Sequence, residues 1–485
     1  MSDDLKVDLC VIGAGPGGLS VAAVASQMGA STALIEKDKM GGDCLNTGCV
    51  PSKALLAAAH AAEAARRGGR FGVDVSDPAI DSSRVYGHVH GVIAHIAPND
   101  SVERFEGLGV KVIQGAARFT GRRQVEAGDF RVTARSFVIA TGSSPFIPPI
   151  QDLDGVPFHT NETIFDLKVL PRRLIIIGGG PIGIEMAQAH RNLGAGVTVL
   201  EMFSIMPKDD PELVEILRNL LKAEGVDIRE GVKISRVEKT PHDTPGGGVA
   251  VILGDETRIE GSHLLVAAGR RANVNGLGLE KAGVASSPKG VAPGGIEVDA
   301  RMRTANKKIF AIGGVTGGYQ FTHMAAYHAG IVIRNALFKL PAKADHSAVP
   351  WVTYTSPELA HVGLNEEQAK KRHGGVRGAV RVLRWPFAEN DRAVAEGKTD
   401  GLVKAVVTPK GRILGASILG ANAGDLIQTW TLAISAKLKI SAVASMISPY
   451  PTLGEANKRA AGSFYKEKLL SEGTRKLVRF LSRFG

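Results

Sequence analysis

The feature that most restricts the fold of this chain is a glycine-rich turn set between two apolar runs. The run Val7–Ile12 leads into the string GAGPGG at 13–18. A helical stretch over 19–28 follows, and a second apolar run ends at Glu36. The order strand, G-x-G-x-x-G turn, helix, strand and acid is typical of a dinucleotide-binding β-α-β unit.

The same device occurs a second time. The run Leu174–Ile177 leads into GGGPIG at 178–183, a helical stretch over 184–193 follows, and the next run ends at Glu201. In both copies the acid lies 23 positions after the first glycine (36 minus 13, and 201 minus 178). A single glycine-rich turn is weak evidence, but two copies with equal spacing predict two dinucleotide sites.

Each position of the repeat has a physical role. The first glycine allows the tight turn, the second lets the backbone approach a pyrophosphate, and the third lets the helix pack on the strand. The helix N-terminus offers free N–H groups to phosphates, and the final acid accepts hydrogen bonds from a ribose diol. Two sites predict FAD and a nicotinamide nucleotide, although spacing alone does not assign them. Glu201 favours NADH over NADPH, because a carboxylate repels a 2′-phosphate.

Two of the three cysteines, Cys44 and Cys49, lie in the string GGDCLNTGCVPSK at 41–53. Residues five apart in a regular helix are too distant to form a disulfide, so a bridge needs a distorted turn, to which Gly48 and Pro51 are suited. An Ala-rich helix is expected to begin after Pro51, and its dipole lowers the pKa of a nearby thiol. The pair is compatible with structural cysteines, a metal site or a redox dithiol; the setting favours the redox dithiol, and no metal site is expected.

The third cysteine, Cys10, is expected to be a small core residue inside a strand. Three cysteines are too few for a disulfide-stapled secreted domain, so a cytoplasmic location is expected. The net charge is +11, but the sequence has neither the spacing of zinc ligands nor a helix-turn-helix pattern. No nucleic-acid partner is therefore predicted.

The string G-G-x-C-x-x-x-x-C-x-P-S-K resembles the signature of the class I pyridine nucleotide-disulfide oxidoreductases, in the dihydrolipoamide dehydrogenase and mercuric reductase group. The resemblance extends from about Val7 to Phe464. It implies that the first glycine-rich unit binds FAD and the second NAD(P)H. It also implies that Cys49 is the charge-transfer thiol and Cys44 the interchange thiol, while Lys53 approaches the flavin and pairs with Glu185.

Three further strings are similar to the family: ATGS at 140–143, AAGR at 267–270 and IFAIGG at 309–314. The catalytic residues that the resemblance implies are Cys44, Cys49, Lys53, Glu185, Tyr450 and Glu455. The cofactor-binding residues are Gly13, Gly15, Pro16, Gly17, Gly18, Glu36, Lys37, Gly42, Asp43, Cys44, Lys53, Ala116, Thr141, Gly142, Ser143, Gly178, Gly180, Ile182, Gly183, Glu185, Glu201, Gly269, Gly314 and Val315.

Two positions depart from the family pattern. Gly314 stands where the family has an aspartate that binds the flavin ribityl chain, and the lost bond is expected to weaken FAD binding by about 1.5–3 kcal/mol. Tyr450 stands where disulfide reductases have the histidine of His-x-x-x-x-Glu, although Glu455 remains. A tyrosine with a pKa of about 10 is a poor base. Mercuric reductases resemble this chain in having tyrosine there, but the tail 475–485 has no cysteine pair and no N-terminal C-x-x-C module is present.

The predicted fold class is α/β, with two Rossmann-like domains for FAD and NAD and a C-terminal α+β dimerisation domain. The FAD domain is expected at 1–150 and 285–345, the NAD(P) domain at 151–284, the dimerisation domain at 346–465, and a basic tail at 466–485. The resemblance implies a homodimer whose active site is shared between subunits, with Tyr450 and Glu455 facing Cys44 of the partner subunit.

The tail places Leu477, Phe480, Leu481 and Phe484 at helical spacing among Arg475, Lys476, Arg479 and Arg483. It is predicted to pack on its own dimer, with weak contact to an anionic membrane surface as the alternative.

The predicted function is NADH-dependent electron transfer through FAD to the Cys44–Cys49 disulfide, and on to a lipoamide-like disulfide or a soft metal ion. A diaphorase-like quinone reductase and a weakly catalytic docking subunit of a multienzyme complex are the alternatives.

Overall fold

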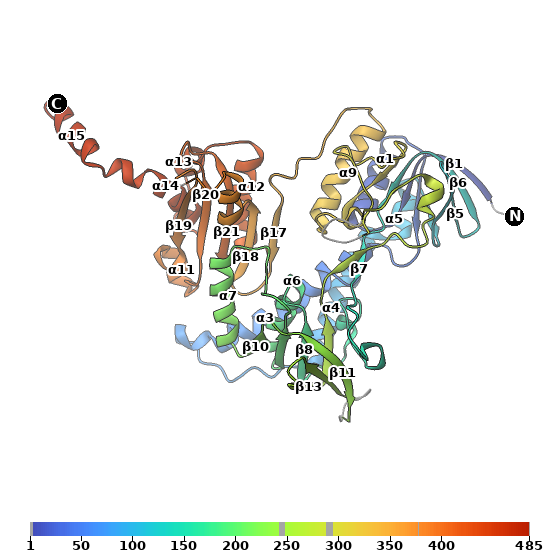
Figure 1. Ribbon diagram of the computed structural model, residues 1–485, viewed down its shortest axis with the longest axis horizontal. Coiled ribbons are helices and arrows are strands. Elements are labelled where there is room, and N and C mark those ends of the chain that lie inside the picture. The colour runs from blue at the N-terminus through green and yellow to red at the C-terminus, as the bar shows by residue number, and fades with distance from the viewer. Residues whose placement is uncertain (1–2, 242–247, 288–293, 377, 485) are drawn as a thin grey trace. The chain divides into compact units, whose positions relative to one another are not determined.

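The computed structural model describes residues 3–241, 248–287, 294–376 and 378–484. The chain divides into two compact units (Figure 1). The first, here called the nucleotide unit, comprises Met1–Phe203 and Val226–Asp345; the second, the C-terminal unit, comprises Ser204–Gly225 and His346–Gly485.

The nucleotide unit contains two sheets whose central strands are parallel, one for each glycine-rich device. In the first sheet the strand order is β3-β2-β1-β6-β5-β4, and β16 also pairs with β6. The strands β3, β2, β1, β6 and β16 pair in parallel, whereas β4 and β5 are joined antiparallel. The bounds are β1 Asp3–Ile12, β2 Thr32–Glu36, β3 Val110–Gln114, β4 Arg118–Gly121, β5 Gln124–Ala127, β6 Phe130–Ile139 and β16 Ile309–Ala311.

The second sheet has the parallel order β10-β9-β8-β14, beside the antiparallel group β11-β12-β13. Its bounds are β8 Arg173–Ile177, β9 Gly196–Leu200, β10 Val226–Arg229, β11 Ile234–Thr240, β12 Gly248–Leu253, β13 Arg258–Gly261 and β14 His263–Val266. Helix α6 (Pro181–Asn192) joins β8 to β9 as α1 (Pro16–Gln27) joins β1 to β2. The predicted repeat is therefore a structural repeat.

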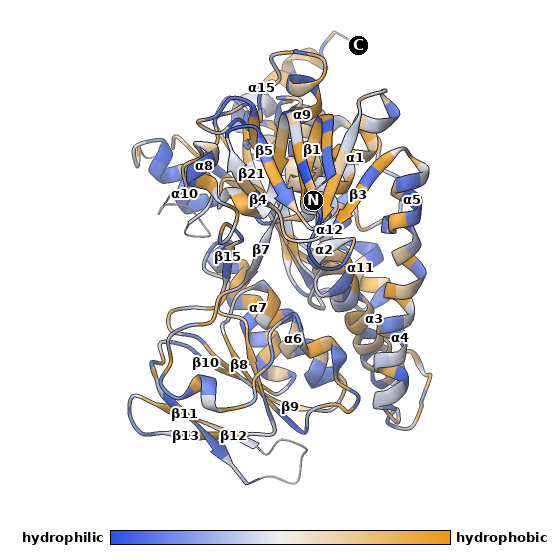
Figure 2. Cartoon of the chain, turned by 90° about the vertical axis from the view of Figure 1, so that its right-hand side faces the viewer, coloured by the Kyte–Doolittle hydropathy of each residue, from blue (hydrophilic) through white to orange (hydrophobic). Residues whose placement is uncertain are grey.

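Apolar side chains of the central strands form the cores of both sheets. The residue Cys10 of β1 is fully buried, in agreement with its predicted core role. Figure 2 shows hydrophilic and hydrophobic colour along β1, whose first residues are polar and whose last four are apolar. The strand β1 begins at Asp3, four residues before the predicted start at Val7, because these polar residues also pair with β6.

The helices of the nucleotide unit begin earlier than the sequence analysis predicted. Helix α1 begins at Pro16 and not at 19, because proline is well suited to the first helical position. Helix α3 (Cys49–Arg66) begins two residues before Pro51, because the missing N–H of a proline costs nothing in the first turn. The other elements are α2 Gly42–Asn46, α4 Ser82–Ile96, α5 Val102–Gly107, β7 Ser143–Pro145, β15 Arg270–Ala272, α8 Leu279–Ala282 and α9 Thr322–Ala336.

The C-terminal unit is built on an antiparallel sheet in the order β17-β18-β21-β20-β19. The buried side chain of Trp430 lies in its core. The strands are β17 Pro350–Thr353, β18 Glu358–Gly363, β19 Arg381–Pro386, β20 Leu402–Val407 and β21 Ile413–Gly420. The helices are α7 Pro211–Ala223, α10 Glu366–Arg372, α11 Asp391–Glu396, α12 Ala423–Ser435, α13 Ile440–Ser445, α14 Glu455–Leu469 and α15 Glu472–Leu481. The two parallel folds and this α+β unit confirm the predicted fold class.

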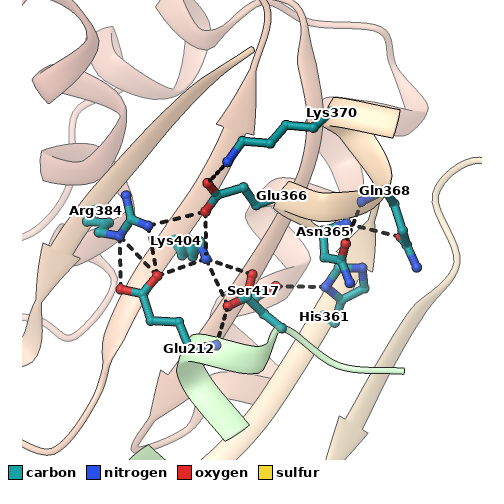
Figure 3. Close-up of polar contacts among 10 residues, drawn as sticks. Glu212, His361, Asn365, Glu366, Gln368, Lys370, Arg384, Lys404 and Ser417 are labelled. Atoms are coloured by element: carbon teal, nitrogen blue, oxygen red, sulfur yellow. Dashed lines mark hydrogen bonds and ion pairs between the residues drawn. The ribbon is translucent and has the colours of Figure 1, made fainter. Parts of the chain in front are cut away.

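Helix α7 lies in sequence between β9 and β10, yet it belongs to the C-terminal unit. A buried ion cluster holds it there (Figure 3). The Lys404 ammonium, 3% exposed, lies 2.9 Å from Asp210 and 2.8 Å from Glu212 at the start of α7, and 3.0 Å from Glu366. Arg384 also pairs with Glu212, at 2.8 Å. Removing Lys404 would leave the buried Asp210 carboxylate without this cation, which costs about 3–5 kcal/mol.

Candidate active site

The two glycine-rich turns have the same backbone geometry. Gly13 has φ +103° and Gly178 has φ +114°, values that favour glycine. A Cβ atom on Gly13 would lie 2.5 Å from the carbonyl oxygen of Ala140, and one on Gly178 would lie 2.4 Å from that of Ala267. The first glycine of each copy is therefore required by both conformation and space.

The third glycine of each copy is required by helix packing. A Cβ on Gly18 would lie 1.8 Å from the carbonyl oxygen of Gly13, and one on Gly183 would lie 2.0 Å from that of Gly178. The middle glycines differ, because no described atom lies within 4 Å of a Cβ built on Gly15 or Gly180. The open space is the kind that a pyrophosphate needs at a helix N-terminus, so the residues fit a dinucleotide at each turn.

The acids at the ends of β2 and β9 are bound to the turns in the same way. Glu36 Oε2 accepts a hydrogen bond from the backbone N–H of Ala14 at 2.6 Å. Glu201 Oε2 accepts one from the N–H of Gly179 at 2.7 Å. The equal spacing in sequence thus places both carboxylates beside their turns, where a ribose is expected; the exposed Lys37 follows Glu36.

The two turns differ in how they are covered. Gly17 is buried, and a Cβ there would lie 3.0 Å from Cβ of Ala325 on α9 and 3.1 Å from Cδ1 of Ile312. At the equivalent position of the second copy, Ile182 is 38% exposed. The first turn is therefore covered by α9 of its own unit, whereas the second is open.

The cysteine segment is attached to the first turn and not to the second. The backbone N–H of Gly41 donates to the carbonyl oxygen of Ala14 at 2.9 Å. Gly42 has φ +57°, and a Cβ there would lie 2.8 Å from Cα of Gly15. These contacts place the dithiol beside the first dinucleotide site, which is where a flavin that exchanges electrons with it must bind.

Cys44 lies on α2, and Cys49 is the first residue of α3. Between the two helices Gly48 adopts φ −123° and ψ −112°, so the chain is not one regular helix. Both cysteines are free thiols, and their side chains are hydrogen-bonded to each other. The break between α2 and α3 is the distorted turn that the spacing of five requires.

The two thiols have opposite proton affinities. The hydrogen bond from Cys44 is the largest of the effects that lower the pKa of Cys49 to about 6; burial opposes it, and the Thr322 hydrogen bond and the charge of Lys53 act in the same direction as Cys44. The Thr322 Oγ1 atom of α9 lies 3.5 Å from Cys49 Sγ. The same bond and burial raise the pKa of Cys44. Cys49 is therefore the thiolate and Cys44 the thiol of the reduced pair near neutral pH.

Lys53 lies one turn after Cys49 and donates to Glu185 Oε2 of α6 at 2.7 Å. This is the pair that the resemblance implies. Lys53 comes from the first dinucleotide fold and Glu185 from the second, so the pair joins the two folds of the nucleotide unit next to the dithiol. A cation here stabilises the Cys49 thiolate.

Two residues that the sequence analysis did not assign to the site hold Asp43. Arg270 Nη2 lies 3.2 Å from Asp43 Oδ2, and its Nε donates to Ser143 Oγ at 2.9 Å. Asn161 Nδ2 donates to Asp43 Oδ1 at 2.9 Å and to the carbonyl oxygen of Thr47 at 3.0 Å. Arg270 belongs to the AAGR string, so a signal existed, whereas nothing near Asn161 indicated its contact.

Two of the remaining predicted segments, ATGS near the FAD and AAGR at the strand leaving the nicotinamide domain, are followed by segments that hydrogen-bond to each other. Thr141 Oγ1 donates to the carbonyl oxygen of Asn273 at 2.7 Å, and β7 pairs with β15. Gly142 and Gly269 have positive φ of 67° and 119°. Ala116 is exposed in the loop between β3 and β4.

The segment around Gly314 lies against Ser143. A Cβ on Gly314 would lie 3.1 Å from Ser143 Oγ, the hydroxyl that Arg270 binds. Val315 next to it is buried, and its carbonyl oxygen accepts from the N–H of Ile296 at 2.8 Å. An aspartate at 314 would therefore need Ser143 to yield by a few tenths of an ångström.

In the C-terminal unit, Tyr450 and Glu455 each bind another partner. The Tyr450 hydroxyl donates to Asp391 Oδ2 of α11 at 2.9 Å, and this carboxylate raises the pKa of the tyrosine. Glu455 pairs with Arg459 at 2.7 Å. The Tyr450 ring is 68% exposed. The glutamate thus does not orient the tyrosine in the way it orients the histidine of the family pattern.

Asn390 fixes the loop that carries Tyr450. Its Nδ2 donates to the carbonyl oxygen of Thr452 at 3.1 Å, and its Oδ1 caps α11 by accepting from the N–H of Ala393 at 3.0 Å. Asn390, Asp391 and Arg459 were not predicted from sequence, because no motif pointed to them. Asn390 and Asp391 hold Tyr450 exposed, with its hydroxyl donating a hydrogen bond to the Asp391 carboxylate.

Two nucleotide-binding folds, a dithiol at the first of them and an α+β unit define a flavin- and nicotinamide-dependent disulfide reductase. The chain belongs to the pyridine nucleotide-disulphide oxidoreductase family. The sequence pattern of that family matches residues 7–329, and the pattern of the family's dimerisation domain matches residues 349–461. The enzyme uses FAD and NAD(P)H, and the dimerisation domain supports a homodimer.

The chain is 35% identical to a mercuric reductase from Staphylococcus aureus over 96% of this chain and 83% of that protein. It is 36% identical to a dihydrolipoyl dehydrogenase from Thermus scotoductus, over 95% of this chain and 98% of that protein. A solved structure of the Cu(II) complex of the flavoprotein disulfide reductase RclA from Escherichia coli has a TM-score of 0.83 and 28% identity, covering 94% of this chain and 99% of that one. These relatives favour a reductase over a quinone-specific diaphorase or a docking subunit.

The described residues contain neither a metal-binding cluster of His, Cys, Asp or Glu side chains nor a membrane-spanning helix. Within 3–241, 248–287, 294–376 and 378–484, no group of three or more His, Cys, Asp or Glu side chains is arranged to hold a metal ion. In the same ranges no helix is long and apolar enough to cross a membrane.

Proposed function

We propose that this NAD(P)H-dependent flavoprotein reductase transfers electrons to a soft metal cation bound by the thiolates of Cys44 and Cys49, with NADH as the preferred donor. The observation that carries the proposal is the pairing of Tyr450 with Asp391 and of Glu455 with Arg459. These pairs leave the C-terminal loop without the acid–base dyad that disulfide substrates need.

Reduction of a disulfide requires a proton to be moved to and from the substrate sulfur. A tyrosine whose hydroxyl donates to a carboxylate, and whose pKa is raised, neither accepts nor readily releases a proton at neutral pH. A soft cation binds two thiolates directly and needs no such group. The balanced reaction for a divalent cation that takes two electrons is NADH + M²⁺ → NAD⁺ + H⁺ + M⁰.

The chain's own residues fit distinct roles in this reaction. Bound FAD supplies two-electron transfer between the nicotinamide and the dithiol. The turn at 13–18 binds the FAD pyrophosphate and the turn at 178–183 that of the nicotinamide nucleotide, with Glu36 and Glu201 at the riboses. The hydrogen bond from Cys44 keeps Cys49 ionised, with help from Lys53, which Glu185 holds. Cys44 carries the proton of the reduced pair and releases it when its sulfur binds the cation.

The relatives support both candidate acceptors. Mercuric reductases and a Cu(II) complex of a disulfide reductase favour a soft cation. Dihydrolipoyl dehydrogenases of similar identity favour a lipoamide-like disulfide as the second candidate. We also propose a cytoplasmic homodimer in which Tyr450 and Glu455 face Cys44 of the partner subunit. The predicted domain bounds stay part of this proposal.

The test is NADH oxidation by the purified holoenzyme with Hg(II) or Cu(II) in the presence of a small thiol, against lipoamide and glutathione disulfide. We expect kcat/KM for a metal ion to exceed that for either disulfide by about 100-fold or more, the usual contribution of an acid–base group. Cys44→Ser should abolish metal reduction while FAD and NADH still bind. Tyr450→His should raise lipoamide turnover. Wild-type turnover of lipoamide that equals or exceeds metal turnover would overturn the proposal.

A further inference from the structure

The C-terminal helix α15 carries an apolar face that its own unit leaves exposed. It extends beyond α14, away from the sheet of the same unit (Figure 1). None of its residues is buried in the described structure. The exposed fractions of its large apolar side chains and of the following phenylalanine are Leu477 55%, Val478 59%, Phe480 54%, Leu481 55% and Phe484 74%.

The side chains of this segment are sorted by chemistry around the helix. At about 100° per residue, the five apolar side chains lie within an arc of roughly 160°. The cations lie on the opposite side: Arg475, Lys476, Arg479 and Arg483. Phe480 and Phe484 contact each other edge to face on the apolar side, with ring centroids 5.1 Å apart. A low overall hydrophobicity, combined with apolar and cationic side chains on opposite sides of the helix, is typical of helices that lie in the plane of a membrane interface.

The charge of the polar face indicates what covers the helix. Arg475, Arg479 and Arg483 follow one another at i, i+4 spacing, where like charges destabilise a helix. Lys476 pairs with Glu472 at 3.3 Å, but among the described residues no acid forms an ion pair with these three arginines. A second copy of the tail would add the same positive charges. An anionic surface neutralises them while it buries the apolar face.

We infer that the segment 472–484 is an interfacial anchor that binds this reductase to the surface of an anionic lipid bilayer. The helix lies flat, with Leu477, Phe480 and Leu481 among the acyl chains and the arginines at the level of the lipid phosphates. Its ten residues span about 15 Å, far too short to cross the bilayer. This inference is independent of the proposed acceptor, because no residue of the redox site takes part.

The experiment measures how the full-length holoenzyme partitions onto vesicles of phosphatidylcholine with and without about one third phosphatidylglycerol, at low and at high salt. We expect binding to the anionic vesicles at low salt, with little binding to phosphatidylcholine alone and loss at high salt. Each arginine removed should lower the partition coefficient by about fivefold. NADH oxidation in solution should be unchanged.

Two variants and a matched control separate the contributions. Leu477→Ser combined with Phe480→Ser removes the apolar anchor, and Arg479→Glu combined with Arg483→Glu reverses the charge; both should lower binding at least tenfold. The control, Lys410→Glu with Arg412→Glu, makes the same charge change at exposed positions of the turn between β20 and β21, and should bind as the wild type does.

Three outcomes would overturn the inference. One is equal binding of the wild type and the Leu477→Ser/Phe480→Ser variant to anionic vesicles. Another is equal loss of binding in the control, which would indicate diffuse attraction by the whole chain. The third is a change in oligomeric state of the tail variants, measured by sedimentation in the absence of lipid, without an effect on vesicle binding. That result would assign the apolar face to the dimer.

Discussion

The two dinucleotide turns of this enzyme are nearly identical in backbone but different in their surroundings. Gly13 and Gly178 have similar positive φ, and the middle glycines are equally open. Gly17 of the first turn, however, is buried against α9, whereas Ile182 of the second is exposed. The first turn is also bonded to the dithiol segment through Gly41 and Ala14.

We propose that this difference separates a resident cofactor from one that exchanges. FAD must stay bound through every catalytic cycle, and a turn covered by its own unit suits that requirement. A nicotinamide nucleotide must enter and leave in every cycle, and an open turn suits it. The same sequence device thus serves two kinetic roles, and the residue after the proline, Gly17 or Ile182, distinguishes them.

We expect the largest effect when a side chain is added at the third glycine of either turn. Gly18→Ala places a Cβ 1.8 Å from a carbonyl oxygen, and Gly183→Ala places one at 2.0 Å. Each should cost about 3 kcal/mol in cofactor binding, the upper end for overpacking. Gly18→Ala should purify without yellow colour, whereas Gly183→Ala should stay yellow and show a raised KM for NADH. Loss of FAD from the Gly183→Ala variant would contradict the assignment of the two turns.

The next largest effect is expected at the acids that end β2 and β9, Glu36 and Glu201. Glu201→Arg should reverse the preference for NADH over NADPH by about 30- to 100-fold in the ratio of kcat/KM, because a cation replaces a carboxylate near the 2′ position. Glu201→Gln is the matched control, which keeps the size of the side chain and should shift the ratio less. The equivalent change at Glu36 should alter FAD retention and leave the nucleotide preference as it is.

A smaller effect on cofactor binding should follow from substitutions at the position that differs between the turns, Gly17 in the first and Ile182 in the second. Gly17→Ala would crowd Ala325 and Ile312, and should weaken FAD retention by about 1–2 kcal/mol. Ile182→Ala should change NADH binding by less than about 0.5 kcal/mol, as is usual for an exposed site. Retention is measured as the fraction of FAD left after dilution and gel filtration. Equal effects of the two changes would remove the distinction between covered and open turns.

The smallest effect is expected at Gly314. Gly314→Asp adds a carboxylate that can hydrogen-bond the flavin chain, a gain of about 1.5–3 kcal/mol. The Cβ contact of 3.1 Å with Ser143 Oγ offsets part of it, so net tightening of about 1 kcal/mol is expected. Combining Gly314→Asp with Ser143→Gly removes the crowding and should tighten FAD binding further. Weaker FAD binding in the double variant than in Ser143→Gly alone would show that the flavin does not lie here.

Much of the fold was predictable because it follows from local chemistry. The glycine strings and the acids at 36 and 201 fixed the two nucleotide folds, and the glycine and proline around Cys49 indicated the broken helix. Arg270, Asn161 and Asp391 escaped prediction because each contacts a segment distant in sequence. The place of α7 was unpredictable for the same reason. Lys404 forms ion pairs with the carboxylates of Asp210, Glu212 and Glu366, and no local sequence pattern indicates that these residues are in contact.

In the reduced enzyme, Cys49 should be a thiolate beside the flavin. The direct measurement is anaerobic titration of the holoenzyme with NADH, following the long-wavelength thiolate-to-flavin absorption band from pH 5 to 8. Because the pKa of Cys49 is lowered to about 6, the band should grow as pH rises through that value. In Cys44→Ser, which cannot form the disulfide, the band should be present before NADH is added, with its midpoint moved to higher pH, and in Cys49→Ser it should be absent. A band that persists in Cys49→Ser, or none at any pH in the wild type, would contradict the account.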